Sequence, residues 1–163
     1  MDMDSRAHMT NEERLAALRI ELPTSPKPVA RFANAKRIGQ TLYLSGQIPR
    51  GRDGAPITGV VGDDISRAEA YDHARLVGLA LLAVARDELG SLDQVAGVSK
   101  LFGMVRATPD FADHPAVIDG CSDLFADIFG EAGIHARSAV GMASLPMQAT
   151  LEIEAILELH QYS

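Results

Sequence analysis

The C-terminal part of the chain has the most regular alternation of apolar and polar positions. From Ala149 to Leu159, apolar side chains occupy every second position with mainly glutamate between them, as in a strand that buries one face. The preceding segment, Arg137 to Leu145, is rich in small and apolar residues and predicts another strand. Because a two-residue turn at Pro146-Met147 can join these segments, the pattern predicts a C-terminal hairpin.

Two further segments carry apolar residues at helical spacing. The longer one predicts a helix over Ile65 to Leu89, with Asp63 or Asp64 capping its start and Gly90 its end. The other predicts a helix over Pro115 to Gly130, because proline suits the first turn of a helix and glycine suits its stop. These two helices are expected to be the main ones.

The rest of the chain supplies a short helix and three strands. Thr10 to Glu13 reads as a capping box, which predicts a short helix that ends before Pro23. Strands are predicted at Arg31–Arg37, Thr41–Gln47 and Val95–Arg106. The expected order is therefore helix, β, β, α, β, α, β, β.

This order predicts an α/β (α+β) domain, a mixed sheet with two main helices on one face plus an N-terminal helix. Residues 1–9 are expected to be a disordered tail, 10–27 a helix and linker, and 28–163 a single domain. Two helices cover only one face of such a sheet, so we expect the other face to pack against further subunits.

Composition narrows the functions and the compartment. Fifteen basic residues against 22 acidic ones give a net charge of -7, which disfavours nucleic acid as a partner. The one cysteine, Cys121, allows no intrachain disulfide and lies on an apolar helix stripe, so we expect a buried thiol and a cytoplasmic protein. The first residues lack the apolar core of a secretory signal, and no apolar run is long enough to span a membrane.

Common cofactor and metal motifs are not found in the sequence. It contains no GxGxxG motif after a strand, no Walker loop and no HExxH motif, and its five histidines are not at metal-ligand spacing. We therefore expect no cofactor and no metal. His73 is expected to be a surface or packing residue of the long helix.

Arg137 is the residue whose chemistry stands out. It opens a strand of small and apolar residues, and arginine suits two-pronged recognition of a carboxylate. In the predicted hairpin, Arg137, Glu152 and Glu154 share one face, with Glu154 within reach of Arg137. Two interpretations follow: a structural ion pair with Glu154, which spacing alone favours, or an arginine and a glutamate that converge on a small acid in a cleft.

Two sequence motifs favour the second interpretation, in which Arg137 and a glutamate bind a small acid. Ala136 to Val140, Leu145-Pro146 and Leu151 to Glu154 together resemble the C-terminal signature of the RidA family, also called YjgF. Ser45 to Pro49 resembles the second-strand motif of that family, and the resemblance covers roughly Pro28 to Leu159. It implies a chorismate-mutase-like fold and a homotrimer whose ligand sites lie in clefts between subunits.

The resemblance also implies an activity and the residues that carry it. Characterised members hydrolyse reactive 2-imino acids, or their enamine tautomers, to 2-keto acids and ammonia. By this resemblance Arg137 binds the substrate carboxylate, Glu152 positions water and Phe32 lines the site. Gly46 and the backbone around Ala139 are expected near the ligand.

The chain also departs from the family pattern. Deaminases often have cysteine in place of Ala139 and tyrosine in place of Phe32, while Ser122 aligns with a helix asparagine that some members use. These departures, with the N-terminal helical extension, suggest a divergent subgroup. A non-catalytic trimeric binder of a small carboxylate metabolite stays open as an alternative. Ribonuclease activity is disfavoured by the acidic composition.

Overall fold

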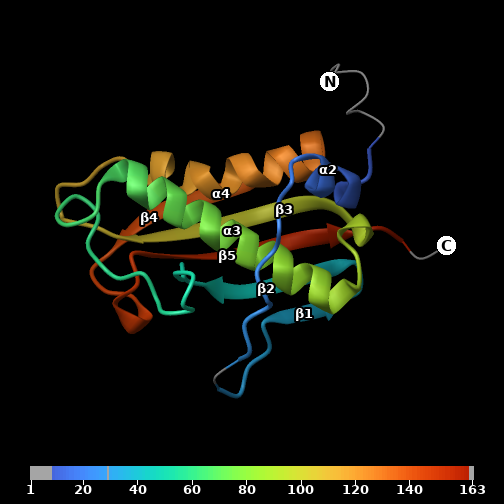
Figure 1. Ribbon diagram of the computed structural model, residues 1–163, viewed down its shortest axis with the longest axis horizontal. Helices are drawn as coiled ribbons and strands as arrows, with labels where there is room; N and C mark the ends of the chain where they lie inside the picture. Colours follow the sequence, from blue (N-terminus) through green and yellow to red (C-terminus); the bar gives the residue numbers. More distant parts are fainter. Residues whose placement is uncertain (1–8, 29, 162–163) are drawn as a thin grey trace.

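The computed structural model describes residues 9–28 and 30–161, so nearly all of the predicted tail, 1–9, lies outside the described residues. The predicted order of elements is confirmed (Figure 1). The elements are α2 (Asn11–Ala17), β1 (Ala35–Ile38), β2 (Thr41–Gln47), α3 (Arg67–Leu89), β3 (Val95–Arg106), α4 (His114–Phe129), β4 (Ala136–Met142) and β5 (Leu151–Leu159).

The strands form one five-stranded mixed sheet in the order β1-β2-β5-β3-β4. The pairs β1–β2, β2–β5 and β5–β3 are antiparallel, whereas β3 and β4 are parallel. The helix α4 connects these two parallel strands, as a crossover between parallel neighbours requires.

The predicted C-terminal hairpin is therefore wrong, because β5 does not pair with β4. It lies between β2 and β3, where each of its alternate apolar residues is buried under the helices. The connection is also longer than a two-residue turn: a short 3-10 helix covers Pro146–Gln148, and Met147 and Gln148 have left-handed φ values of 55° and 58°. This loop carries the chain past β3 to the centre of the sheet.

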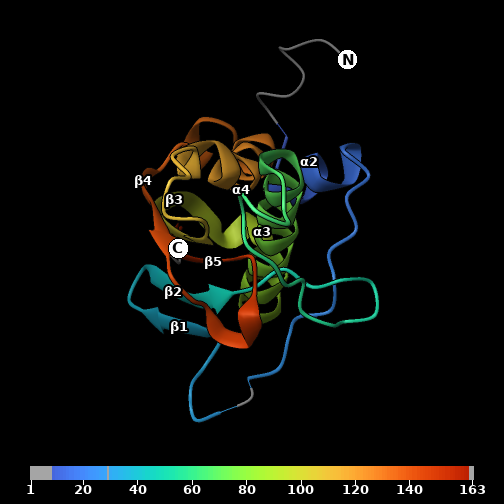
Figure 2. The ribbon, with the colours of Figure 1, turned by 90° about the vertical axis from the view of Figure 1, so that its left-hand side faces the viewer.

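The helices α3 and α4 lie side by side over one face of the sheet, as predicted, and α2 packs against α4 (Figures 1 and 2). The core lies between these layers. Its largest fully buried side chains are Phe125, Leu42, Leu81, Leu82, Leu92, Leu101, Ile118, Leu124, Ile128, Leu151, Ile153 and Leu157. Among the described residues, no helix is long and apolar enough to cross a membrane.

Local capping explains where α2 and α3 begin. The predicted capping box at Thr10 is confirmed, and α3 begins with a similar box at Ser66, whose hydroxyl accepts a hydrogen bond from the Glu69 amide. Asp63 and Asp64 are therefore not the cap of α3, and the Asp64 carboxylate instead accepts a hydrogen bond from the Val60 amide. The glycine stops that follow α3 and α4 are confirmed.

The face of the sheet opposite the helices is uncovered within one chain. Ile38, Tyr43 and Val140 on this face are 61%, 43% and 37% exposed, and half-buried Phe102 and Ile156 lie between them. The expectation that further subunits cover this face stays a prediction.

Candidate functional site

Arg137 lies at the start of the edge strand β4. It is aligned with Leu101 of β3, which is aligned in turn with Ala155 of β5, and both of those residues are buried under the helices. Because aligned residues of neighbouring strands point to the same face, the Arg137 side chain points toward the helix layer. The predicted face shared by Arg137, Glu152 and Glu154 is therefore wrong within one chain.

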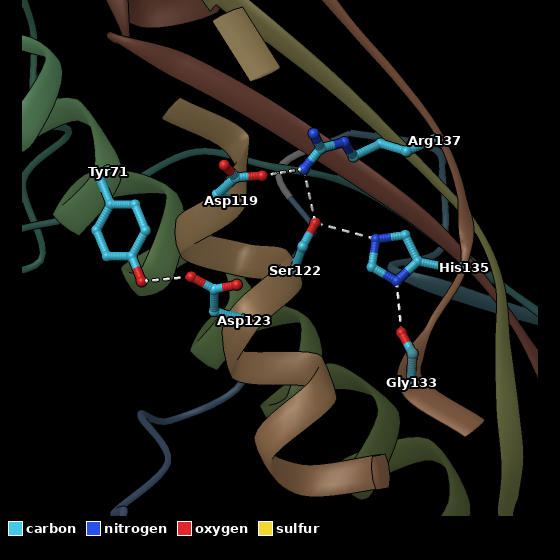
Figure 3. Close-up of polar contacts among 7 residues, drawn as sticks. All are labelled: Tyr71, Asp119, Ser122, Asp123, Gly133, His135 and Arg137. Carbon is cyan, nitrogen blue, oxygen red and sulfur yellow. Dashed lines mark hydrogen bonds and ion pairs between the residues drawn. The ribbon is translucent and has the colours of Figure 1, made fainter. Parts of the chain in front are cut away.

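The guanidinium of Arg137 contacts α4 rather than β5. Its Nη1 atom donates to Asp119 Oδ1 at 2.8 Å and to Ser122 Oγ at 3.0 Å (Figure 3). The ion-pair partner of Arg137 is thus Asp119 and not Glu154. The Arg137 side chain is 22% exposed and that of Asp119 is 47% exposed, so the pair lies at the rim of the molecule.

One edge of this guanidinium has no hydrogen-bond partner among the described residues. Among the residues that the structure describes, none hydrogen-bonds to Nε or Nη2 of Arg137. These two nitrogens carry parallel N–H donors on one edge of the planar group, which matches the two oxygens of a carboxylate. The geometry therefore allows a small acid to bind beside the Asp119 contact without displacing it.

The Ser122 hydroxyl extends the contact toward His135. Ser122 Oγ lies 3.0 Å from His135 Nε2, and His135 Nδ1 lies 2.6 Å from the Gly133 carbonyl oxygen (Figure 3). Burial lowers the pKa of His135, with a smaller lowering from the charge of Arg137, against a raising effect of the Gly133 hydrogen bond. The site thus combines a fixed cation with a hydroxyl and a half-buried imidazole.

A second group of predicted residues lies on the opposite face of the sheet. Glu152 on β5 is aligned with Met104 of β3, and its carboxyl group fills the space beside Gly46 of β2. A Cβ atom at Gly46 would lie 2.0 Å from Glu152 Oε1, so only glycine allows this contact. Burial raises the pKa of Glu152, and the charge of Glu154 raises it further.

With the remaining residues included, the predicted site residues lie in three separate places in one chain. Ala139 follows Arg137 on the same face of β4 and is half-buried against the core. Phe32 is 49% exposed and lines a 550 Å³ pocket with the segment 24–28 and α3. One chain therefore brings together Arg137, Ser122 and Ala139, brings together Gly46 and Glu152, and leaves Phe32 apart from both groups.

Two residues of the site, Asp119 and His135, are not identified as site residues by the sequence analysis. Asp119 precedes Ser122 by three positions, which places both on one face of a helix. His135 precedes Arg137 by two positions, which is the spacing of residues on one face of a strand. Both spacings can be read from the sequence, but they indicate a shared site only when α4 is known to lie over β4.

The other candidate side chains have structural roles. Cys121 is fully buried and burial raises the pKa of its thiol, in agreement with the predicted buried thiol. His73 is half-buried and its Nδ1 atom lies 3.2 Å from Thr150 Oγ1, as expected of a packing residue. Within the described part of the chain, no three His, Cys, Asp or Glu side chains gather to hold a metal ion.

Known proteins resemble this chain over most of its length. The family model described as "YjgF/chorismate_mutase-like, putative endoribonuclease" matches residues 12–159. Protein TCP17 of Trypanosoma cruzi is 37% identical over 147 residues, which are 90% of this chain and 92% of that protein. The 2-iminobutanoate/2-iminopropanoate deaminase of Dermatophagoides farinae is 32% identical over 139 residues, 85% of this chain and 93% of its relative.

A solved structure agrees with this match. The protein Atu1372 of Agrobacterium tumefaciens, described as of unknown function, has a TM-score of 0.84 and 40% sequence identity, with 92% of each chain covered. The family match and the deaminase relative both cover far more than half of the chain. The chain therefore belongs to the YjgF/RidA family.

Proposed function

We propose that this protein hydrolyses reactive 2-imino acids, or their enamine tautomers, to 2-keto acids and ammonia. The observation that carries the proposal is Arg137, which α4 holds at the rim of the molecule with its Nε–Nη2 edge free among the described residues. That edge suits the carboxylate of an imino acid. The relative from Dermatophagoides farinae, named for a reaction of this class, supports the choice of substrate.

The residue types suit this chemistry without a metal or cofactor. The carbon of an imine is already electrophilic, so an enzyme has only to hold the substrate and position a water molecule. Arg137 holds the carboxylate, and Glu152 accepts a hydrogen bond from the attacking water. The raised pKa of Glu152, caused first by burial, makes its carboxylate a stronger proton acceptor than an exposed glutamate.

The proposed site needs more than one chain. Arg137 and Glu152 lie on opposite faces of the same sheet, and Phe32 lies apart from both. A homotrimer in which the rim of one subunit meets the open face of the next subunit supplies Arg137 from one chain and Glu152 with Gly46 from its neighbour. The exposed apolar residues of that open face favour such contacts. A cytoplasmic location is part of the same proposal.

The test generates imino acids in situ with an amino acid oxidase and traps them with semicarbazide. Wild-type protein is expected to divert several imino acids to keto acids before trapping. Arg137→Ala is expected to lower kcat/KM about 10- to 100-fold, the effect of losing charge-assisted hydrogen bonds worth about 1.5–3 kcal/mol. Arg67→Ala is a matched control, because Arg67 also pairs with a carboxylate, that of Asp113, at 3.5 Å on the surface. Absence of diversion by wild type would reject the deaminase.

A metabolite-binding protein without turnover is the second candidate. Phe32 has no hydroxyl group and Ala139 has no thiol, so this chain lacks two polar groups that deaminases of the family often carry. Calorimetry with 2-ketobutyrate tests this candidate directly. Binding that Arg137→Ala abolishes, in a protein that accelerates no imine hydrolysis, would identify a carboxylate-binding protein.

A further inference from the structure

We propose that Ser122 and His135 form a proton relay, in which Ser122 takes one proton of the attacking water, whose other proton is hydrogen-bonded to Glu152, while the hydroxyl proton of Ser122 passes to His135. The proposal rests on the proposed deaminase function and adds to it the residues that move the proton on the Arg137 side of the site. Ser122 is the catalytic residue here because its hydroxyl touches the reacting water. His135 acts through Ser122 and is a positioning residue that also stores the proton.

The hydrogen bonds of this group have one consistent direction. The Gly133 carbonyl can only accept, so His135 Nδ1, at 2.6 Å, carries the proton of the neutral ring. His135 Nε2 is then an acceptor, and the Ser122 hydroxyl donates to it at 3.0 Å. Arg137 Nη1 has no lone pair to offer, so it donates to Ser122 Oγ at 3.0 Å. The chain of donors therefore runs from Arg137 through Ser122 and His135 to Gly133 (Figure 3).

This direction leaves Ser122 able to accept one more hydrogen bond. A hydroxyl oxygen has two lone pairs, and Arg137 occupies one of them. Ser122 is only half-buried, so the second lone pair can face a water molecule. Arg137 contacts Ser122 through Nη1 and offers its Nε–Nη2 edge to the proposed substrate carboxylate, so the relay requires this water to lie between Ser122 and the substrate.

The surroundings of His135 keep its imidazole neutral, which is the form that can accept a proton. The Phe125 ring from α4 packs edge-on against the imidazole at 6.2 Å, and Arg137 from β4 places a positive charge nearby. On α4, Asp119 is bound to Arg137, and Asp123 accepts a hydrogen bond from Tyr71 of α3 instead of facing His135. Burial and the Arg137 charge lower the pKa of His135, so the ring is neutral at pH 7.

The reaction balances with these groups. Water oxygen bonds to the iminium carbon, the C=N π electrons move to nitrogen, and the water proton passes through Ser122 to His135. The His135 proton then returns through Ser122 to the amine nitrogen. The C–N bond breaks as the hydroxyl oxygen forms the carbonyl, and the hydroxyl proton leaves with ammonia as ammonium. Iminium and water thus give keto acid and ammonium, and His135 ends neutral.

The proposed relay also compensates for one departure from the family pattern, the hydroxyl group missing at Phe32. Phe32 lacks the hydroxyl that tyrosine would bring to the site. Ser122 supplies a hydroxyl from α4 in its place, and His135 gives that hydroxyl an internal proton acceptor.

The test compares the pH dependence of kcat/KM for iminoacid hydrolysis in wild type, Ser122→Ala and His135→Gln. In His135→Gln the new amide oxygen can still accept from Ser122, but the amide does not titrate. We expect wild type to lose activity as the pH falls through the lowered pKa of His135, below the usual 6.5. Both variants should lose on the order of 100-fold in kcat with little change in KM, and should lack this acid limb. Ser122→Thr, which keeps the hydroxyl, should restore most of the activity.

Two matched variants and two outcomes complete the test. The exposed residues Ser144 and His160 provide Ser144→Ala and His160→Gln, which should leave both rate and pH profile unchanged. Turnover by His135→Gln with the wild-type acid limb would overturn the relay and leave the deaminase standing. No turnover by wild type would overturn the deaminase and the relay with it. Thermal melts of each variant separate loss of fold from loss of chemistry.

Discussion

Gly46 and Glu152 show how a single missing side chain makes room for a carboxyl group. The Glu152 carboxyl group occupies the space that a Cβ atom at Gly46 would need. The backbone of Gly46 does not have a positive φ, so glycine is required here for space and not for conformation. The atoms in the way belong to the flexible end of Glu152, which can swing aside at little cost.

Gly46→Ala is therefore expected to displace Glu152 without unfolding the protein. The free energy of unfolding should change by less than about 1 kcal/mol, because no backbone has to move. The kcat for imino acids should fall to the level of Glu152→Gln, which measures the value of a correctly placed carboxylate. Gly51→Ala is the control, since the one close approach to a Cβ atom at Gly51 is the end of the Asp53 side chain, in a loop. Wild-type kcat in Gly46→Ala would contradict the role given to Glu152.

At the residue scale, the sequence singles out Arg137 but not the residues that hold its side chain. Arg137 stands out because a cation in a strand of small residues calls for an anionic partner. Its actual partner, Asp119, is 18 positions away, and their contact depends on how α4 crosses β4. Strand alternation predicts which face a side chain takes, but not which element lies over that face. His135 and Asp119 were missed for this reason.

At the scale of elements, two glycines allow α3 and α4 to pack closely. A Cβ atom at Gly120 of α4 would lie 2.0 Å from the Tyr71 carbonyl oxygen, which belongs to the backbone of α3. A Cβ atom at Gly78 of α3 would meet Leu124 Cδ2 at 2.9 Å and Cys121 Sγ at 3.1 Å, which are side-chain atoms. Side-chain atoms can rotate away from a new Cβ atom but backbone atoms cannot, so Gly78 should tolerate alanine better than Gly120.

Gly120→Ala should therefore separate the helices and destabilise the fold by about 1–3 kcal/mol, the usual cost of overpacking. Gly78→Ala is the matched comparison, because both changes gain the same helix propensity of about 1 kcal/mol and only the packing term differs. Urea unfolding of the two variants measures the difference. Equal free energies of unfolding would contradict a close backbone contact at Gly120.

Several element boundaries follow from the sequence, although the strand predicted at Arg31–Arg37 is Ala35–Ile38 in the structure. Strand order does not follow from the sequence. The strands Thr41–Gln47 and Val95–Arg106 are predicted to the residue, because alternation and turn residues are local signals. The predicted pairing of β4 and β5 is wrong, because alternation is identical for a hairpin and for two strands separated by a third. The fully buried inner face of β5 reflects its central position in the sheet, whereas β4, none of whose residues is fully buried, is an edge strand.

At the scale of the whole molecule, the proposed site requires a second chain, because its residues are divided between the two faces of one sheet. Arg137, Ser122 and His135 lie on the helix side at the β4 edge, whereas Glu152 and Gly46 lie on the open side. A trimer of identical subunits repeats both groups three times and can place each rim against a neighbouring open face. In the proposed trimer, every complete site would take Arg137 from one chain and Glu152 from another.

Mixed trimers test this arrangement with two inactive variants. Arg137→Ala and Glu152→Gln subunits, refolded together in equal amounts, should recover about a quarter of wild-type activity, because each site draws its two residues independently from neighbouring chains. Arg137→Ala mixed with Ser122→Ala should recover none, since those residues act from the same chain. Recovery is measured as imine hydrolysis per subunit, with ultracentrifugation to confirm that trimers formed. Background activity in the first mixture would place Arg137 and Glu152 of each site in one chain, which their opposite faces argue against.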